Sequence, residues 1–231
     1  MAVLYRQAAA CLLLLLPFVT FSQAVTTDTS AKLKVIGNKA YLSSVKANPD
    51  NQLVEIKKAI PNITLDIRYA TSNNFMKQVM YKQARAFARK PVVARLKQIQ
   101  AALNVKGYGL KIYDAYRPYA ITVAFYKKAT NKAYVASPKK GSKHNRGCAV
   151  DLTLIDLKTG KDLEMPTPYD SFQPQASPTF SALPPAALKN RNFLIATMHK
   201  YGFKVIHNEW WHFDFNGWNR YDIMDIPFEK L

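Results

Sequence analysis

Two short segments of this chain place imidazole and carboxylate side chains where they could share one metal ion. The first segment holds His144 and Asp151 seven residues apart, with Gly147 between them. The second, Glu209-Trp-Trp-His212, adds another histidine and a spare carboxylate. A catalytic zinc keeps three protein ligands and leaves a fourth position for water, which a nearby carboxylate can deprotonate. The two segments together therefore contain the residue types of a hydrolytic zinc site.

The spacing inside each segment limits how its residues can meet. Both spacings are odd, and residues an odd number apart on a regular strand point to opposite faces. His144 and Asp151 can reach one metal only if the chain turns between them, and Gly147 can adopt the positive φ of such a turn. Glu209 and His212 need a similar break, which we expect at a strand end or a bulge.

Periodic patterns predict the elements that position these segments. Alternating apolar and polar residues predict a strand over residues 63–69. Pro91 opens a helix that Gly107 ends, with a buried stripe at helical spacing. That stripe consists of Val92, Leu96, Ile99 and Leu103. Further strands are expected at 110–114, 149–155, 203–206 and 211–215, and further helices at 119–128 and 186–201.

The first residues of the chain have the features of an export signal. Arg6 supplies a positive start, residues 8–18 are apolar, and Ser22-Gln23-Ala24 offers small residues for cleavage. The alternative, an uncleaved membrane anchor, is disfavoured because the apolar run is shorter than the ~20 residues of a spanning helix. We therefore expect export to the periplasm or the exterior, with cleavage near Ala24.

The remaining 207 or so residues suit a single domain of about 200 residues. We expect residues 25–51 to form a polar N-terminal arm with one strand at 34–36, and residues 52–231 to form the catalytic domain. Cys148 is the one cysteine left after cleavage, and we expect it to be a small buried packing residue. Catalysis by its thiolate is an alternative that would need a nearby base such as His144.

The formal net charge of +18 favours contact with polyanions. Export points to an anionic cell-wall polymer or a membrane surface, and we expect no nucleic-acid partner. No run of Lys and Arg is interleaved with aromatic residues as in a groove for single strands. The alternative is a basic surface that only keeps the protein soluble.

Three motifs resemble those of the zinc D-alanyl-D-alanine dipeptidases, in the order of that family. They are Tyr113-Asp-Ala-Tyr-Arg117-Pro, Ser142-Lys-His144-Asn-Arg-Gly-Cys-Ala-Val-Asp151 and Glu209-Trp-Trp-His212. The resemblance runs from about Leu65 to the C-terminus. It implies an α+β fold, in which helices flank a central, mainly antiparallel sheet shared with the hedgehog signalling domain.

The resemblance also implies a role for each residue of the site. It assigns His144, Asp151 and His212 to one Zn²⁺ per chain, Glu209 to the general base, and Arg117 to the developing oxyanion. Of the residues implied to bind substrate, two hold its carboxylate and one holds its free ammonium group. These residues are Ser142 and Tyr81 for the carboxylate and Asp170 for the ammonium.

The sequence therefore predicts an exported zinc peptidase that cleaves D-Ala-D-Ala or short peptides released from peptidoglycan. One alternative is a D,D-carboxypeptidase that trims longer stem peptides. Another is a zinc-containing, non-catalytic module that binds the cell wall. The presence of Glu209 and Arg117 argues against that module, because binding alone needs neither a base nor an oxyanion partner.

Overall fold

A five-stranded sheet in the order β3-β5-β6-β8-β7 forms the centre of the molecule. The computed structural model describes residues 33–231. The strands of this sheet are β3 (Thr64–Leu65), β5 (Tyr108–Asp114), β6 (Ala149–Asp156), β7 (Phe203–Ile206) and β8 (Glu209–Phe215). Only β3 and β5 pair in parallel, and the other neighbours are antiparallel. The predicted α+β fold with a mainly antiparallel sheet is confirmed.

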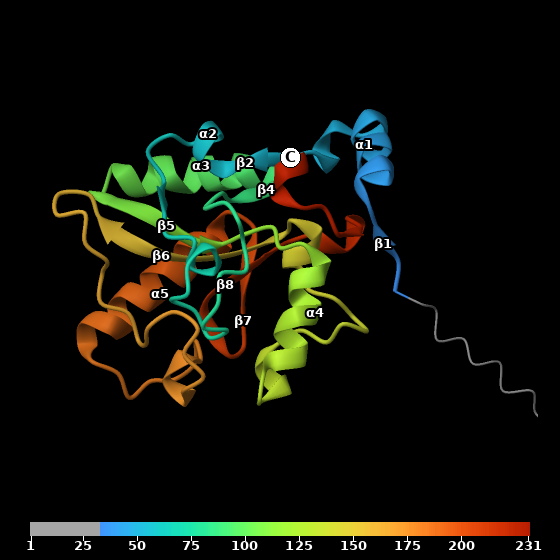
Figure 1. Ribbon diagram of the computed structural model, residues 1–231. Coiled ribbons are helices and arrows are strands. Elements are labelled where there is room, and N and C mark those ends of the chain that lie inside the picture. Colours follow the sequence, from blue (N-terminus) through green and yellow to red (C-terminus); the bar gives the residue numbers. More distant parts are fainter. Residues whose placement is uncertain (1–32) are drawn as a thin grey trace, which may run out of the picture. The chain divides into compact units, whose positions relative to one another are not determined.

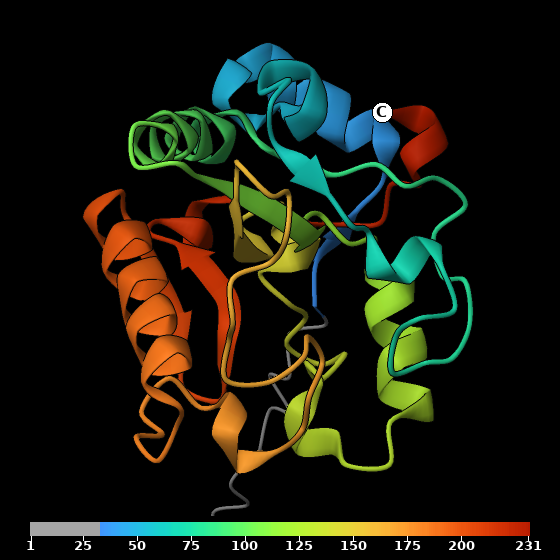
Figure 2. The same ribbon diagram turned by 90° about the vertical axis from the view of Figure 1, so that its left-hand side faces the viewer.

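The helices around this sheet are α1 (Asn38–Ala47), α2 (Ile56–Ala59), α3 (Lys90–Asn104), α4 (Tyr119–Lys128) and α5 (Pro185–Lys200). Helices α3 and α5 lie on opposite faces of this sheet, and the other helices lie around it, as Figure 1 shows. Helix α3 packs against β5, and α5 packs against β6, β7 and β8. In Figure 2, α4 and α5 lie on opposite sides of the segment that follows β6. Strand β6 is buried along all but its last residue, as expected of a strand covered on both faces.

Most of the predicted helices and strands are present at nearly the expected positions. Helix α3 begins with a proline in its first turn and buries the whole predicted stripe of apolar residues. The predicted strand at 203–206 coincides with β7, and the helix at 119–128 coincides with α4. Local periodicity was sufficient for α3 because this helix buries one continuous apolar stripe.

The predicted strand over residues 63–69 is wrong beyond its first residues. Strand β3 covers only Thr64–Leu65, and a 3-10 helix, η2 (Arg68–Ala70), follows it. The backbone N–H of Asp66 still donates to Ile112 of β5, and the chain then turns away from the sheet. The turn buries Tyr69 beside the site described below.

Residues 33–51 contain more regular structure than the expected polar arm. They carry the expected strand, β1 (Val35–Ile36), and in addition α1 and the 3-10 helix η1 (Pro49–Asn51). Strand β1 pairs in parallel with β9 (Ile223–Met224) near the C-terminus. Helix α1 was not predicted because Tyr41 is its one buried residue, which gives a weak periodic signal. The expected signal peptide lies outside the described residues.

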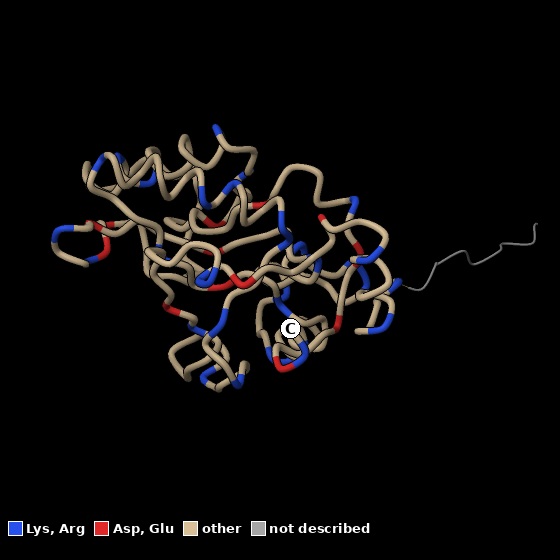
Figure 3. The backbone as a smooth tube through the Cα atoms, turned by 90° about the horizontal axis from the view of Figure 1, so that it is seen from above, with Lys and Arg blue, Asp and Glu red and all other residues tan. Residues whose placement is uncertain are grey.

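Several short elements complete the described chain. They are β2 (Leu53–Glu55), β4 (Phe87–Arg89), η3 (Lys132–Tyr134), η4 (His144–Arg146), η5 (Pro174–Ala176), η6 (Trp218–Arg220) and η7 (Phe228–Lys230). Strands β2 and β4 form a separate antiparallel pair. Lys and Arg residues are spread along the whole described chain and outnumber Asp and Glu, as Figure 3 shows. Among residues 33–231, no helix combines the length and apolar character needed to cross a membrane.

Candidate active site

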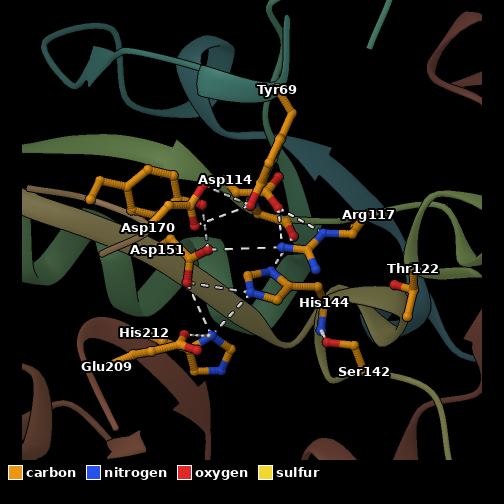
Figure 4. A network of polar contacts seen from close by, with 12 residues as sticks. Tyr69, Asp114, Arg117, Thr122, Ser142, His144, Asp151, Asp170, Glu209 and His212 are labelled. Atoms are coloured by element: carbon orange, nitrogen blue, oxygen red, sulfur yellow. Dashed lines mark hydrogen bonds and ion pairs between the residues drawn. The ribbon is translucent and has the colours of Figure 1, made fainter. Parts of the chain in front are cut away.

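Three side chains from separate elements converge at the centre of the sheet, as Figure 4 shows. His144 lies in η4, Asp151 on β6 and His212 on β8, and one potential ligand atom of each lies within 4.8 Å of the others. The register of β6 and β8 places Asp151 directly opposite His212. Gly147 has φ of 69°, and the turn there returns His144 to the same place. The turn predicted at Gly147 is confirmed.

The outer nitrogen of each imidazole is already engaged. His144 donates from Nδ1 to the carbonyl oxygen of Ala115 at 2.6 Å. His212 donates from Nε2 to Oδ1 of Asp214 at 2.9 Å. In the neutral imidazoles, the inner nitrogens of His144 and His212 therefore carry lone pairs, and they lie only 3.1 Å apart.

A carboxylate oxygen completes this group of lone pairs. Asp151 Oδ1 lies 3.0 Å from His212 Nδ1 and 3.4 Å from His144 Nε2. It is buried and accepts no hydrogen bond from the described residues. Three buried electron-pair donors that face one another require a positive charge between them. Two imidazoles and a carboxylate are a donor set that zinc accepts, so these residues fit the expected metal.

The pKa shifts of these groups point to the same need for positive charge. Burial lowers the pKa of His212, but Asp151 and Asp214 outweigh burial and raise it to about 10. Burial acts to raise the pKa of Asp151, but His144 and His212 hold it well below its usual range. A proton therefore neutralises the cluster when no metal does, and proton and metal compete for the same atoms.

Glu209 is placed beside this cluster without belonging to it. It begins β8, and its Oε2 lies 3.8 Å from His212 Nδ1. The pairing of β7 with β8 is irregular next to it, between Val205 and Ile206, as the odd spacing to His212 required. Burial raises the pKa of Glu209 to about 7. A carboxylate that titrates near neutral pH suits proton transfer.

Arg117 follows β5 and is held by a buried ion pair. Its Nε and Nη2 donate to Oδ2 of Asp114 at 3.0 and 2.7 Å. Its Nη2 also lies 3.9 Å from Asp151 Oδ2, which directs the guanidinium toward the cluster. The backbone of Arg117 bonds to the His144 carbonyl and to the Asn145 side chain. The guanidinium therefore has one orientation, fixed before any substrate binds.

The structure does not bring Tyr81 to the cleft. Its hydroxyl donates to Asp114 Oδ1 at 2.9 Å, and its ring packs against Tyr69 and Phe228. Tyr81 is buried and is not among the residues that line the cleft. Its contact with a substrate carboxylate stays a prediction, and in this structure Tyr81 braces the carboxylate that orients Arg117.

Ser142 and Asp170 do line the cleft, which has a volume of about 500 Å³. Ser142 Oγ accepts a hydrogen bond from the backbone N–H of His144 at 3.2 Å. Asp170 has a left-handed backbone with φ of 60° and accepts from the Tyr69 hydroxyl at 3.0 Å. Burial and the nearby Asp151 raise the pKa of Asp170 well above its usual range. A cation beside Asp170 would relieve that penalty.

Besides Asp114, three residues of the site were missed in the sequence. Tyr69 bonds to Asp170, Tyr169 bonds to Asp151, and Asp214 bonds to His212. The contact of Asp214 with His212 could have been predicted, because residues two apart on a strand point to the same face. The Tyr69 contact spans 101 residues and left no local signal. Cys148 is buried as expected, does not line the cleft, and has a pKa that burial raises to about 12, all of which argues against the thiolate alternative.

Comparisons with known proteins find a matching family and several relatives. Residues 49–227 match the model of the peptidase M15 family, described as D-Ala-D-Ala dipeptidase. The D-alanyl-D-alanine dipeptidase of Escherichia coli (strain K12) is 34% identical over 163 residues, covering 71% of this chain and 84% of the relative. That of Enterococcus faecalis (strain ATCC 700802 / V583) is 28% identical over 202 residues, covering 78% and 95%. A solved LD-carboxypeptidase, LdcB, is 20% identical with a TM-score of 0.39 and covers 58% of this chain and 61% of that one.

Proposed function

This chain belongs to the D-Ala-D-Ala dipeptidase family of hydrolases, and on that premise we propose that it is a zinc-dependent dipeptidase that cleaves D-Ala-D-Ala. The observation that carries the proposal is the convergence of three buried lone-pair atoms, among which Asp151 Oδ1 accepts no hydrogen bond from the described residues. The ligands in this proposal are His144, Asp151 and His212. The carboxylate of Glu209 and the guanidinium of Arg117 lie beside these ligands.

Zinc bound at these atoms would polarise the scissile carbonyl and make a water molecule nucleophilic at neutral pH. Glu209 accepts a proton from the attacking water and returns it to the leaving amine. Arg117 faces the cluster and stabilises the negative charge that develops on the carbonyl oxygen. Because Asp114 fixes the guanidinium in advance, little reorganisation is needed in the transition state.

The two ends of a dipeptide have matching groups in the cleft. Asp170 is a carboxylate whose burial favours a cationic partner, and a free α-ammonium supplies that charge. Ser142 lies at another part of the lining and offers a hydroxyl to the substrate carboxylate. A substrate without a free ammonium cannot form this ion pair, so it loses the attraction that Asp170 offers.

We also propose that the protein acts outside the cytoplasm. The support is the apolar leader at residues 1–24 with its small-residue cleavage site. There the substrates are D-Ala-D-Ala and short peptides from peptidoglycan. The excess of Lys and Arg along the described chain favours contact with an anionic cell-wall polymer or membrane surface.

Incubation of the purified mature protein with D-Ala-D-Ala tests the proposal. We expect release of D-alanine that a chelator abolishes and added zinc restores. The N-acetylated dipeptide and a wall pentapeptide should be cut slowly or not at all. Equal rates on the pentapeptide would favour the D,D-carboxypeptidase alternative. Zinc binding without any hydrolysis would favour the non-catalytic wall-binding module.

A further inference from the structure

The two carboxylate oxygens of Asp151 have different surroundings. Oδ1 faces the imidazole nitrogens of His144 and His212 and accepts no hydrogen bond from the described residues. Oδ2 accepts a hydrogen bond from the hydroxyl of Tyr169 at 2.9 Å. Arg117 Nη2 lies 3.9 Å from the same Oδ2. One oxygen is therefore left for a metal while the other is engaged by the protein.

Packing fixes the ring of Tyr169 in this position. The ring stacks on Tyr113 with centroids 4.6 Å apart and planes inclined by 25°. The ring of Tyr169 also makes an edge-to-face contact with Trp211, with the ring centroids 5.6 Å apart. The next residue, Asp170, has φ of 60°, so the backbone bends immediately after Tyr169. The side chain is buried, and its hydroxyl has little freedom to leave Asp151.

The coordination mode of a carboxylate decides how many positions remain on a metal. A carboxylate that binds through both oxygens occupies two positions, whereas one that binds through a single oxygen occupies one. A catalytic zinc with three protein ligands needs its fourth position for water. An oxygen that already accepts a hydrogen bond is a weaker second ligand, because one of its lone pairs is engaged and the hydrogen bond holds the carboxylate in one orientation.

We infer that Tyr169 is a positioning residue that keeps Asp151 bound to the metal through Oδ1 alone, so that one coordination position stays open. The inference rests on the proposed zinc site and adds a residue outside its three ligands. Tyr169 acts through Asp151, because its hydroxyl bonds to the carboxylate.

The variant Tyr169→Phe tests the inference because it removes the hydroxyl and keeps the ring. Cobalt(II) is substituted for zinc in both proteins, and the visible absorption spectrum then reports the coordination number. We expect the variant to show the weaker absorption of a higher-coordinate ion, together with a change of about 10- to 100-fold in zinc affinity or kcat. An unchanged spectrum with unchanged affinity and kcat overturns the inference.

The matched control is Tyr113→Phe, which removes the hydroxyl of the ring stacked on Tyr169. Its spectrum and activity should equal those of the wild type. If both variants change the spectrum alike, the effect comes from the aromatic packing and the inference fails. Circular dichroism of each variant confirms that the fold is intact before the spectra are compared.

A second measurement needs no variant. X-ray absorption or a zinc-bound crystal structure of the wild-type protein shows whether Asp151 contributes one oxygen or two. Two equal zinc–oxygen distances from Asp151 overturn the inference directly. The proposed function can fail separately from this inference. A wild-type protein that binds zinc through Asp151 Oδ1 but does not cleave D-Ala-D-Ala supports the inference and contradicts the proposed activity.

Discussion

In β8, Nε2 of His212 donates to Oδ1 of Asp214 at 2.9 Å, from a position two residues earlier on the same face of the strand. The other oxygen of Asp214 lies 3.1 Å from Nζ of Lys143, the residue that precedes His144. Asp214 therefore connects the two segments that carry the imidazoles. The hydrogen bond also fixes which nitrogen of His212 is free for a metal.

Asp214→Ala should weaken zinc binding by about 10- to 100-fold, because His212 loses the partner that fixes its tautomer and its ring orientation. Asp214→Asn should lose less, because an amide oxygen still accepts the hydrogen bond. Competition against a chromogenic chelator measures both affinities. Asp162→Ala, at a partly exposed ion pair with Lys111, is the control and should bind zinc as the wild type does. Wild-type affinity in Asp214→Ala would contradict the prediction.

Substitutions of Glu209 and His212 should have different effects on metal binding and on proton transfer. Glu209→Gln should retain zinc and lose about a hundred- to ten-thousand-fold in kcat, because an amide cannot accept a proton from water. His212→Ala should lose zinc and activity together. Metal analysis beside steady-state kinetics distinguishes the two patterns. Near wild-type turnover in Glu209→Gln would remove it as the base.

Arg117→Ala should lower kcat by roughly a hundred- to a thousand-fold, with a smaller effect on KM, because the guanidinium acts mainly in the transition state. Arg117→Lys should recover only part of the rate, since lysine lacks the planar fork that pairs with Asp114. Steady-state kinetics on D-Ala-D-Ala give both constants. An effect confined to KM would instead make Arg117 a substrate anchor.

Asp170→Asn should lower kcat/KM for D-Ala-D-Ala by about 10- to 100-fold, in line with the ~1.5–3 kcal/mol of a hydrogen bond to a charged group. The isosteric amide still accepts from the Tyr69 hydroxyl but no longer attracts the ammonium. If the wild-type protein cleaves the N-acetylated dipeptide slowly, Asp170→Asn should cleave it at the same rate. If Asp170→Asn leaves kcat/KM unchanged, the ammonium group binds elsewhere and the carboxypeptidase alternative is favoured.

Glu55 should make stability depend on acid pH. Bidentate hydrogen bonds from Arg85 lower its pKa from 4.5 to about 2 in the folded protein. The ion pair therefore stabilises the fold fully above pH 4.5, and this contribution disappears as the pH falls toward 2. Solvent screening keeps it at about 1 kcal/mol.

Urea unfolding at several pH values measures this contribution. Glu55→Gln should be less stable than the wild type at pH 7, and the difference should vanish near pH 2. The control Glu164→Gln changes an exposed glutamate and should follow the wild type at every pH. A difference that stays constant with pH would mean that Glu55 acts through packing and not through its charge.

Much of this fold follows from local sequence. Helix α3 and strand β7 appear where they were predicted, and α3 buries an apolar stripe whose pattern is visible within a dozen residues. The turn at Gly147 was also predictable, but for another reason: His144 and Asp151 can meet only if the chain turns between them. The residue types of the candidate site were also evident from the spacing of short motifs.

Tertiary structure alone decided which groups meet. The register of β6 against β8 sets Asp151 opposite His212, and no local pattern in either strand specifies that register. Tyr81 illustrates the limit, since packing against Phe228 and bonding to Asp114 took it away from the cleft. The hydrogen bond from Tyr169 to Asp151 depends on a bend at Asp170 and on rings from two other strands. Contacts of this kind join distant residues, so their energies appear only once the whole chain has folded.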